Sequence, residues 1–464
     1  MRESNNDSGL TAQRSNRLLA AGLTAILMAV SPLGYAQDYA RLGERTIMGT
    51  ARYVGMGGAM SAIGGDPSSV QDNPACLGLY RRSEVLVTFD ESLDRAQVAN
   101  GKYEGFTPLF IIPQASVEIS MPSYASTDKG IQFNNILFSY QRVRSFSRNL
   151  FATSAGATPS LGALLEQTLT EPLDIAFCAN PTNGSSATQL RESGYVNQFG
   201  IDWSMNISNQ WYVGAGIRFL SASFGSEATY TETFNEINPA GQHMTNRNVS
   251  SLLLSGASVA GAVGLIYRPT GWMRLGFGLQ TASIGALRTY TSGTFTALTD
   301  SLRVSEAPDI SYSDKDFHMP WHTSTSVAFQ IGAWAMISMQ YDYFHQKDEP
   351  DLHSLRAGFE VIPILGMYIN GGYAYESTFK DDRRIVPIDD TFCRQDTYFQ
   401  HPGRTGAHYA SVAVGYRGTH VLAQLAYQYR CQSLLFWQLP TTDPYTFNTD
   451  THRIILTVGW HRHY

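Results

Sequence analysis

Hydrophobic and polar residues alternate along the final segment of the chain. Successive side chains of an extended strand point to opposite faces, so this alternation gives the segment one apolar and one polar face. An apolar face that ends in aromatic residues, with a polar face behind it, is typical of a strand between lipid and a lumen. The apolar face carries Ile454, Leu456, Val458, Trp460 and Tyr464, and the polar face carries Arg453, Thr457, Gly459, His461 and His463.

The same period of two recurs from Glu84 onward, for example in 335–343 and 419–430. Most of the alternating segments are long enough for the roughly 9–11 residues that a tilted spanning strand needs. They number fourteen, and a bacterial single-chain barrel needs an even number. We expect strands at 84–90, 107–121, 131–144, 195–208, 210–224, 255–268, 271–283, 321–332, 334–346, 352–363, 365–377, 405–417, 419–430 and 450–464.

The connections between these segments alternate in length. Tight turns on one side and long polar loops on the other are typical of outer-membrane barrels, in which the turns are periplasmic. One outward connection, 347–351, is short, and 161–169 has helical spacing within its loop. The predicted turns are 208–210, 268–271, 331–334, 363–366 and 417–419, and the predicted long loops are 145–194, 225–254, 284–320, 378–404 and 431–449.

The composition fits this class of protein. Charged residues make up 16% of the 464 residues, aromatic residues 12%, and glycine occurs 41 times, whereas soluble domains are about 25% charged. The net charge of −6 without a basic stripe argues against nucleic-acid binding. A mean hydropathy of −0.18 argues against a helical membrane protein. We therefore predict an all-β fold, a fourteen-stranded antiparallel transmembrane β-barrel formed by residues 81–464.

The first 36 residues read as a signal peptide. Arg14 and Arg17 precede an apolar stretch from Leu18 to Val30, and a small-residue site ends at Ala36. Thirteen apolar residues are too few to span a membrane comfortably. We therefore expect an exported protein in the outer membrane of a Gram-negative cell.

The cysteines match no metal-binding spacing. Cys393 and Cys431 fall in predicted loops on the same side and are the favoured disulfide pair; free thiols, at Cys76 and Cys178 as well, are about equally expected. His461 and His463 share one face of the last strand, but two ligands without a third are a weak metal site. We expect no metal and no cofactor.

Residues 37–80 differ in character from the barrel segments. They are rich in glycine and turn residues, too apolar for a solvated tail and too irregular for strands. Irregular backbone is tolerated at membrane depth where protein or a water-filled lumen surrounds it. We therefore interpret 37–80 as a plug inside the barrel; a periplasmic arm is the alternative.

The runs Gly55-Met56-Gly57-Gly58-Ala59 and Asn73-Pro74-Ala75, with Asp66 between them, resemble the N-terminal hatch of the FadL/TodX family of outer-membrane channels for hydrophobic compounds. Shorter matches follow at 138–142, 267–276, 356–360 and 415–417, so the resemblance covers nearly the whole mature chain. Cys76 departs from the family, which usually has glycine after Asn-Pro-Ala.

The resemblance implies a mechanism and a set of site residues. Extracellular loops capture a hydrophobic ligand, the hatch shifts, and the ligand leaves sideways through a break in an early strand. The implied hatch residues are Asn73, Pro74, Ala75, Gly57, Gly58 and Asp66. The apolar residues of the first long loop, with two arginines for a carboxylate, are the capture candidates Phe146, Leu150, Phe151, Leu161, Leu164, Leu165, Arg142 and Arg144.

Other functions stay open. Some FadL-like barrels serve as adaptors in protein secretion, and some outer-membrane barrels are hydrolases. Neither a Gly-x-Ser-x-Gly elbow nor an HExxH motif occurs here, so we expect no enzyme. The expected partners are a hydrophobic small molecule or fatty acid, outer-membrane lipid and lipopolysaccharide, and the barrel-assembly machinery during biogenesis. No nucleic acid is expected.

Overall fold

The computed structural model describes residue 42 and the ranges 45–98, 104–123, 129–155, 184–234, 244–299, 303–306, 311–345, 351–377, 406–436 and 445–462. The predicted signal peptide, the helical spacing at 161–169 and the candidates Leu161, Leu164 and Leu165 lie outside these residues. No helix among the described residues is long and apolar enough to cross a bilayer.

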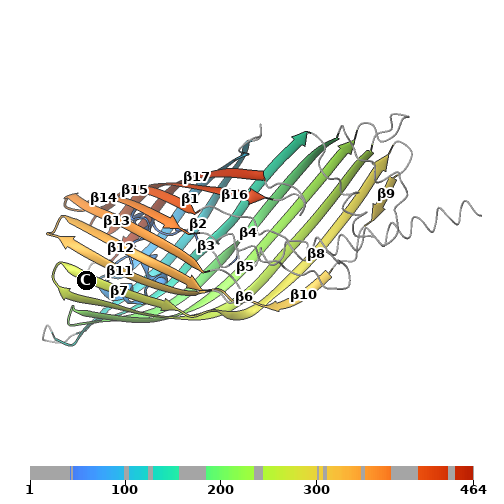
Figure 1. Ribbon diagram of the computed structural model, residues 1–464. Helices are drawn as coiled ribbons and strands as arrows, with labels where there is room; N and C mark the ends of the chain where they lie inside the picture. Colours follow the sequence, from blue (N-terminus) through green and yellow to red (C-terminus); the bar gives the residue numbers. More distant parts are fainter. Residues whose placement is uncertain are drawn as a thin grey trace, which may run out of the picture.

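Seventeen strands form a single sheet (Figure 1). They are β1 (Glu84–Val98), β2 (Glu104–Pro122), β3 (Ile131–Ala155), β4 (Gly184–Ile207), β5 (Trp211–Phe234), β6 (Met244–Thr270), β7 (Met273–Gln280), β8 (Ile284–Thr299), β9 (Arg303–Glu306), β10 (Ser311–Asp316), β11 (Trp321–Ile331), β12 (Ala335–His345), β13 (Leu352–Ile364), β14 (Met367–Glu376), β15 (Ala407–Arg417), β16 (Val421–Phe436) and β17 (Tyr445–His461).

These strands occupy fourteen positions in the wall. β7 and β8 are two parts of one wall strand, since both pair with β6. β10 and β11 are likewise two parts of the next wall strand, which pairs with β8 and β7. β9 is a short strand of four residues that pairs with β8 and adds no position to the wall. β1 pairs with β17 and closes the barrel, and every pairing is antiparallel. The predicted fourteen-stranded antiparallel barrel is confirmed.

The alternation also places side chains as predicted. On β17, Trp460 is 52% exposed on the outer face while Thr457 and His461 are buried on the inner face. On β12, Met339 is exposed while Asp342 is fully buried. The outer face therefore forms an apolar belt around the wall, as a lipid-facing surface requires.

The tight turns all lie at one end of the barrel, hereafter the turn end, and the opposite end is the loop end. The predicted long loops are partly wrong, because strands run deep into them. β3 continues to Ala155, β5 to Phe234, and β8 covers 284–299. Strands β3–β6 and β8 extend well beyond their neighbours in Figure 1. These extensions are rich in Ser and Thr on both faces, so the sequence there lacks the apolar alternation that indicates a strand.

The favoured disulfide is also wrong. Cys431 is a strand residue of β16, paired with Asp450 of β17, and its thiol is free. Its proposed partner, Cys393, lies outside the described residues. Cys76 is free as well and fully buried.

The segment ahead of β1 holds a short helix α2 (Ala51–Gly55) and two 3₁₀ turns, η1 (Ser69–Gln71) and η2 (Pro74–Leu79). We call residues 45–80 the N-terminal segment. Helix α2 contacts β14–β17, while η2 contacts β3–β6 on another part of the wall. Nearly every residue of the segment is buried, so its position is fixed by the inward-facing side chains of the strands.

Candidate functional site

The Asn73-Pro74-Ala75 triplet begins η2 and ties it to the wall. The side-chain oxygen of Asn73 accepts a hydrogen bond from the backbone N–H of Ala75, which caps the turn, and Pro74 occupies the first position, where a missing N–H costs nothing. The Asn73 amide donates to the carbonyl oxygens of Ser61 (2.8 Å) and of Leu265 on β6 (3.3 Å). One side chain thus joins two parts of the segment to the wall.

Glycines of the wall let this backbone approach closely. A Cβ added at Gly264 of β6 would lie 2.0 Å from the Asn73 side-chain oxygen, and one at Gly214 of β5 would lie 2.4 Å from the carbonyl carbon of Pro74. Any side chain there would push the triplet away from the wall. The wall therefore carries a seat shaped for the segment.

Of the other hatch candidates, Gly57 and Gly58 lie in the same interface, and Asp66 bonds within the segment. Gly57 and Gly58 have positive φ angles (63° and 77°), which glycine adopts without strain. A Cβ at Gly57 would lie 2.9 Å from the backbone nitrogen of Tyr373, and one at Gly58 would lie 3.1 Å from Arg356. Asp66 is buried, and its carboxylate accepts hydrogen bonds from the Thr50 hydroxyl (2.6 Å) and the Ser68 N–H (2.9 Å). Burial raises the pKa of Asp66.

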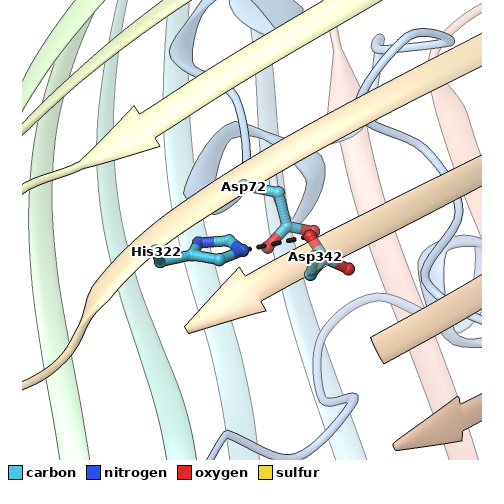
Figure 2. A group of neighbouring side chains, drawn as sticks. All are labelled: Asp72, His322 and Asp342. Atoms are coloured by element: carbon cyan, nitrogen blue, oxygen red, sulfur yellow. Dashed lines mark hydrogen bonds and ion pairs between the residues drawn. The ribbon is translucent and has the colours of Figure 1, made fainter. Parts of the chain in front are cut away.

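A buried ionic network joins the segment to β11, β12 and β13 near Asp72. The Asp72 carboxylate accepts a hydrogen bond from the Tyr53 hydroxyl (2.6 Å) and pairs with Arg356 (3.2 Å). Arg356 also pairs with Asp342 (3.0 Å), which lies 3.0 Å from His322 Nε2. In Figure 2 the imidazole and the two carboxylates converge from separate parts of the chain.

This cluster does not suit a metal ion. Asp72, His322 and Asp342 each offer a ligand atom, all within 4.8 Å of one another. The guanidinium of Arg356, however, already pairs with both carboxylates and supplies the positive charge that a cation would bring. Buried carboxylates are stable only when paired, and here the pairing lies across the interface between segment and wall.

A second ion pair fixes α2 to β13. Arg52 donates two parallel hydrogen bonds to Glu360, of 2.7 and 2.9 Å, in the bidentate geometry that suits arginine and a carboxylate. Farther along the wall, Arg453 of β17 pairs with Asp90 of β1 and donates to the Ile47 carbonyl oxygen (2.8 Å). These contacts were not predicted from the sequence, although charged residues on the inner face of a strand are a signal for them.

On the loop-end side, the segment forms the floor of a cavity that is open to solvent. Thr46 and Met48 of the segment line it together with residues of β1, β2, β3, β4, β16 and β17. Five arginines and two acidic residues face it, beside a smaller apolar part. The lining arginines are Arg95, Arg144, Arg148, Arg430 and Arg453, the acids are Asp94 and Glu192, and the apolar residues include Ala96, Leu109, Ile111 and Phe146.

The capture candidates divide between the two faces of β3. Arg144, Phe146 and Leu150 point inward and are buried, and the first two line the cavity. Arg144 lies over the Phe146 ring, 5.1 Å from its centroid. Arg142 bonds Asn197 (3.1 Å). Neither Arg142 nor Phe151 is among the residues that line this cavity.

The wall beside the cavity lacks a continuous ladder. β2 and β3 pair from Pro122↔Phe133 to Gln114↔Gln141, and within the described residues no pairing between them continues toward the loop end. Pro113, which has no N–H to donate, directly precedes the last paired residue of β2. Residues 107–111 of β2 and 144–149 of β3, the two edges beyond this point, contribute much of the cavity lining.

A β-bulge marks the same level on β3. Arg142 pairs with Asn197 and Arg144 with Val196, so Val143 is an extra residue in the β3–β4 ladder. The Val143 carbonyl accepts a hydrogen bond from the backbone N–H of Thr46 (3.3 Å). The start of the N-terminal segment is thereby attached to the edge where the ladder ends.

An apolar cluster lies next to the cavity on the inner side of the long strands. Phe146 packs edge-on against Phe224 of β5, with centroids 4.9 Å apart. Phe317 and Met319 reach the cluster from the break between β10 and β11, where the Met319 N–H donates to the Ser283 hydroxyl (2.8 Å). The cavity therefore has a charged side and an apolar side.

Comparison with known proteins supports the fold assignment. No family model matches the sequence, and no curated protein matches it. Among solved structures, a FadL homologue from Pseudomonas aeruginosa is 11% identical with a TM-score of 0.56, covering 90% of this chain and 99% of that one. The P. putida toluene transporter TodX is 13% identical with a TM-score of 0.51, and the match covers 90% of this chain and 99% of TodX. The CymD monoaromatic hydrocarbon channel is 10% identical with a TM-score of 0.52, and the match covers 91% of this chain and 100% of CymD. The chain has the fold of FadL/TodX-type outer-membrane barrels.

Proposed function

We propose that this protein is an outer-membrane channel for the diffusive uptake of hydrophobic compounds. A ligand is captured at the loop end, enters the cavity above the N-terminal segment and leaves sideways between β2 and β3. Uptake needs no energy source in this proposal. Burial of apolar ligand surface stabilises the bound ligand by about 25 cal/mol per Å² at each site, and a site that binds only moderately tightly releases the ligand again.

One observation carries this proposal: the cavity is bounded by the two strand edges that do not pair. Residues 107–111 and 144–149 line it, and both belong to the part of the wall beyond the last β2–β3 pair. A ligand in the cavity is therefore next to the place where the wall opens with the least loss of backbone hydrogen bonds. A sealed ladder at this position would favour a closed pore instead.

The N-terminal segment, within residues 37–80, acts in this proposal as the hatch. Its Thr46–Val143 hydrogen bond connects the floor of the cavity to the bulge in β3. A shift of the segment would release that bulge, and movement of β3 would widen the opening. The role of Asn73-Pro74-Ala75 is then to hold the rest of the segment on the wall while its beginning moves.

The charge of the cavity indicates the ligand class. Five arginines line it against two acidic residues; Arg148 is paired with Glu192 and Arg453 with Asp90. Arg144 and Arg430 also line a second, smaller pocket beside it, together with Glu376. A guanidinium binds a carboxylate with directed hydrogen bonds. We infer an amphipathic acid, such as a fatty acid, rather than a neutral aromatic hydrocarbon.

The opening is tested by repairing the wall. Deletion of Val143 removes the bulge and leaves the pairing of Arg144 with Val196 in register, and Pro113→Ala restores an N–H on the β2 edge. The combined variant is expected to fold, as judged by heat-modifiable migration, and to lose most uptake of labelled oleate. Pro122→Ala, on the same strand but in the part already paired with Phe133 of β3, is the control and should transport normally.

The alternatives give other results. Normal uptake by the folded, repaired variant would refute the lateral route. A secretion adaptor would show unchanged uptake together with the loss of a co-purifying exported protein on deletion of 37–75. No observation on the described residues favours a hydrolase. Contacts with lipopolysaccharide and the barrel-assembly machinery stay predictions.

A further inference from the structure

Three hairpins repeat one arrangement on the outer face of the barrel. Each has a Tyr-x-Tyr on its first strand and a histidine on its second, and the second tyrosine lies directly opposite the histidine in the ladder. We call these three groups the clamps. They are Tyr341, Tyr343 and His353 on β12–β13; Tyr373, Tyr375 and His408 on β14–β15; and Tyr427, Tyr429 and His452 on β16–β17.

The geometry of the three clamps is nearly the same. In each, the hydroxyl of the first tyrosine lies 2.7 Å from the histidine Nδ1. The ring of the second tyrosine lies 5.5, 5.0 and 5.2 Å from the imidazole centroid in turn. The imidazole is therefore held by one hydrogen bond and by a neighbouring aromatic ring, always in the same register.

The clamps sit at the loop-end border of the apolar belt. One step toward the turn end, the outer face carries exposed apolar residues such as Leu355 (57%) and Ile454 (57%). One step toward the loop end, it carries Asp351 and Asp450 or, in the β14–β15 clamp, Gly406. Tyrosines concentrate at the level of lipid head groups, so these histidines lie where phosphate groups of the outer leaflet are found.

The hydrogen bond prepares each histidine as a donor. When the tyrosine hydroxyl donates to Nδ1, the ring proton of a neutral imidazole is on Nε2, and a charged imidazole carries a proton there as well. Among the described residues, no hydrogen bond occupies Nε2 in any of the three clamps. A fixed, accessible N–H at head-group level suits an anionic oxygen.

We propose that the three clamps are binding positions for the phosphate groups of outer-leaflet lipid. The tyrosine hydroxyl orients the imidazole, Nε2 donates to a phosphate oxygen, and the acyl chains rest on the apolar belt below. This binding is separate from the lumen, so it does not depend on what the channel transports.

The three clamps differ in the residue that lies two positions before the histidine, and this difference predicts their order of affinity. In two of them, the second tyrosine donates to an aspartate two residues before the histidine: Tyr343 to Asp351 (2.8 Å) and Tyr429 to Asp450 (2.8 Å). The third has Gly406 there, and a Cβ at that position would lie 2.3 Å from the Tyr375 ring. Without a carboxylate to repel the phosphate, the clamp of His408 should bind most tightly.

Native mass spectrometry of the purified full-length protein with defined lipids tests this. The probes are bisphosphorylated lipid A and its fully dephosphorylated form. Changing His353, His408 and His452 together to Phe keeps the ring stacking but removes the donor. We expect at least about fivefold weaker binding of the phosphorylated lipid, unchanged binding of the dephosphorylated lipid, and the largest single effect from His408→Phe. His420→Phe, an exposed histidine at the turn end, is the matched control.

The single variants keep the test valid if the triple variant does not fold. Equal losses for both lipids, or no loss for either, would overturn the proposal and leave the clamps as cross-strand packing. Inorganic phosphate at millimolar concentration should not displace the lipid. Complete displacement by inorganic phosphate would identify a soluble-anion site and contradict the lipid assignment. Uptake of oleate should be unchanged in all these variants.

Discussion

Arg52 of the N-terminal segment holds Glu360 on β13 through two parallel hydrogen bonds of 2.7 and 2.9 Å. Both side chains are largely buried, with exposed fractions of 13% and 5%. The pair is thus a direct energetic connection between the segment and the wall, and it can be broken from either side.

Arg52→Met is expected to loosen the segment. It leaves Glu360 charged and buried without a partner, and breaking a buried pair in this way costs about 3–5 kcal/mol. Guanidinium unfolding curves of Arg52→Met, of Glu360→Gln and of the double variant measure the coupling. The double variant should be more stable than the sum of the single changes predicts, because it removes the orphaned charge.

Arg288→Met is the matched control for the double-mutant cycle of Arg52 and Glu360. Arg288 and Asp314 form an ion pair at the loop end whose side chains are 74% and 77% exposed, and such pairs contribute little. Additive losses for the two buried positions would show that they do not form an energetic pair.

Gly264→Ala should lift the segment from its seat. The new methyl group would lie 2.0 Å from the Asn73 side-chain oxygen, whereas the nearest atom to a methyl at Gly261, on the same strand, is 3.9 Å away. Single-channel conductance in planar bilayers should rise for Gly264→Ala and stay at the parent value for Gly261→Ala. Equal conductance in both variants would argue against a seat at this glycine.

Cys76 gives an independent readout of the same movement. Its thiol is fully buried near the Ser61 carbonyl oxygen (3.3 Å), and burial raises its pKa, so it should not react with maleimide in the closed state. With the other three cysteines changed to Ser, Gly264→Ala should make Cys76 reactive in the folded barrel, while Gly261→Ala should not. Labelling of Cys76 at the parent rate in both would contradict the expected displacement.

The wall was predictable from the sequence because its physical requirement is local. Each strand must alternate apolar and polar residues wherever one face meets lipid, as in the pattern from Ile454 to Trp460. Beyond the belt this requirement ends, so the Ser- and Thr-rich continuations of β3–β6 carry no alternation and read as loops. The strand count depended only on the belt and was therefore right.

The interface between segment and wall was predictable only in part. The glycine-rich run and Asn73-Pro74-Ala75 marked the segment in the sequence, but Gly264 and Gly214, which the triplet approaches, lie about 190 and 140 residues away. Likewise, Asp342 and Arg356 lie on two different strands far from residue 72 in the sequence, and only the folded wall brings them to Asp72. Register between distant strands decides these contacts, and a single sequence does not contain it.

The orientation of the barrel can be checked by labelling intact cells. A tag inserted at Gly271, between β6 and β7 at the turn end, should be inaccessible, because turns of outer-membrane barrels face the periplasm. A tag near Thr182, in the connection between β3 and β4, should be labelled on the cell surface. Labelling in the opposite sense would invert the topology and place the cavity on the periplasmic side.

Arg144 should decide which ligands the cavity prefers. It lines both cavities, and a charge-assisted hydrogen bond to a carboxylate is worth about 1.5–3 kcal/mol. Arg144→Met should therefore weaken oleate binding by roughly 10- to 100-fold, as measured by calorimetric titration of the purified protein. Methyl oleate, which has the same chain without the charge, should bind the variant and the parent alike, and so should toluene. Arg288→Met controls for the loss of a positive charge at the loop end. An equal loss for oleate and its methyl ester would mean that Arg144 supports the packing of Phe146 rather than binding a carboxylate, and the inferred preference for acids would then be wrong.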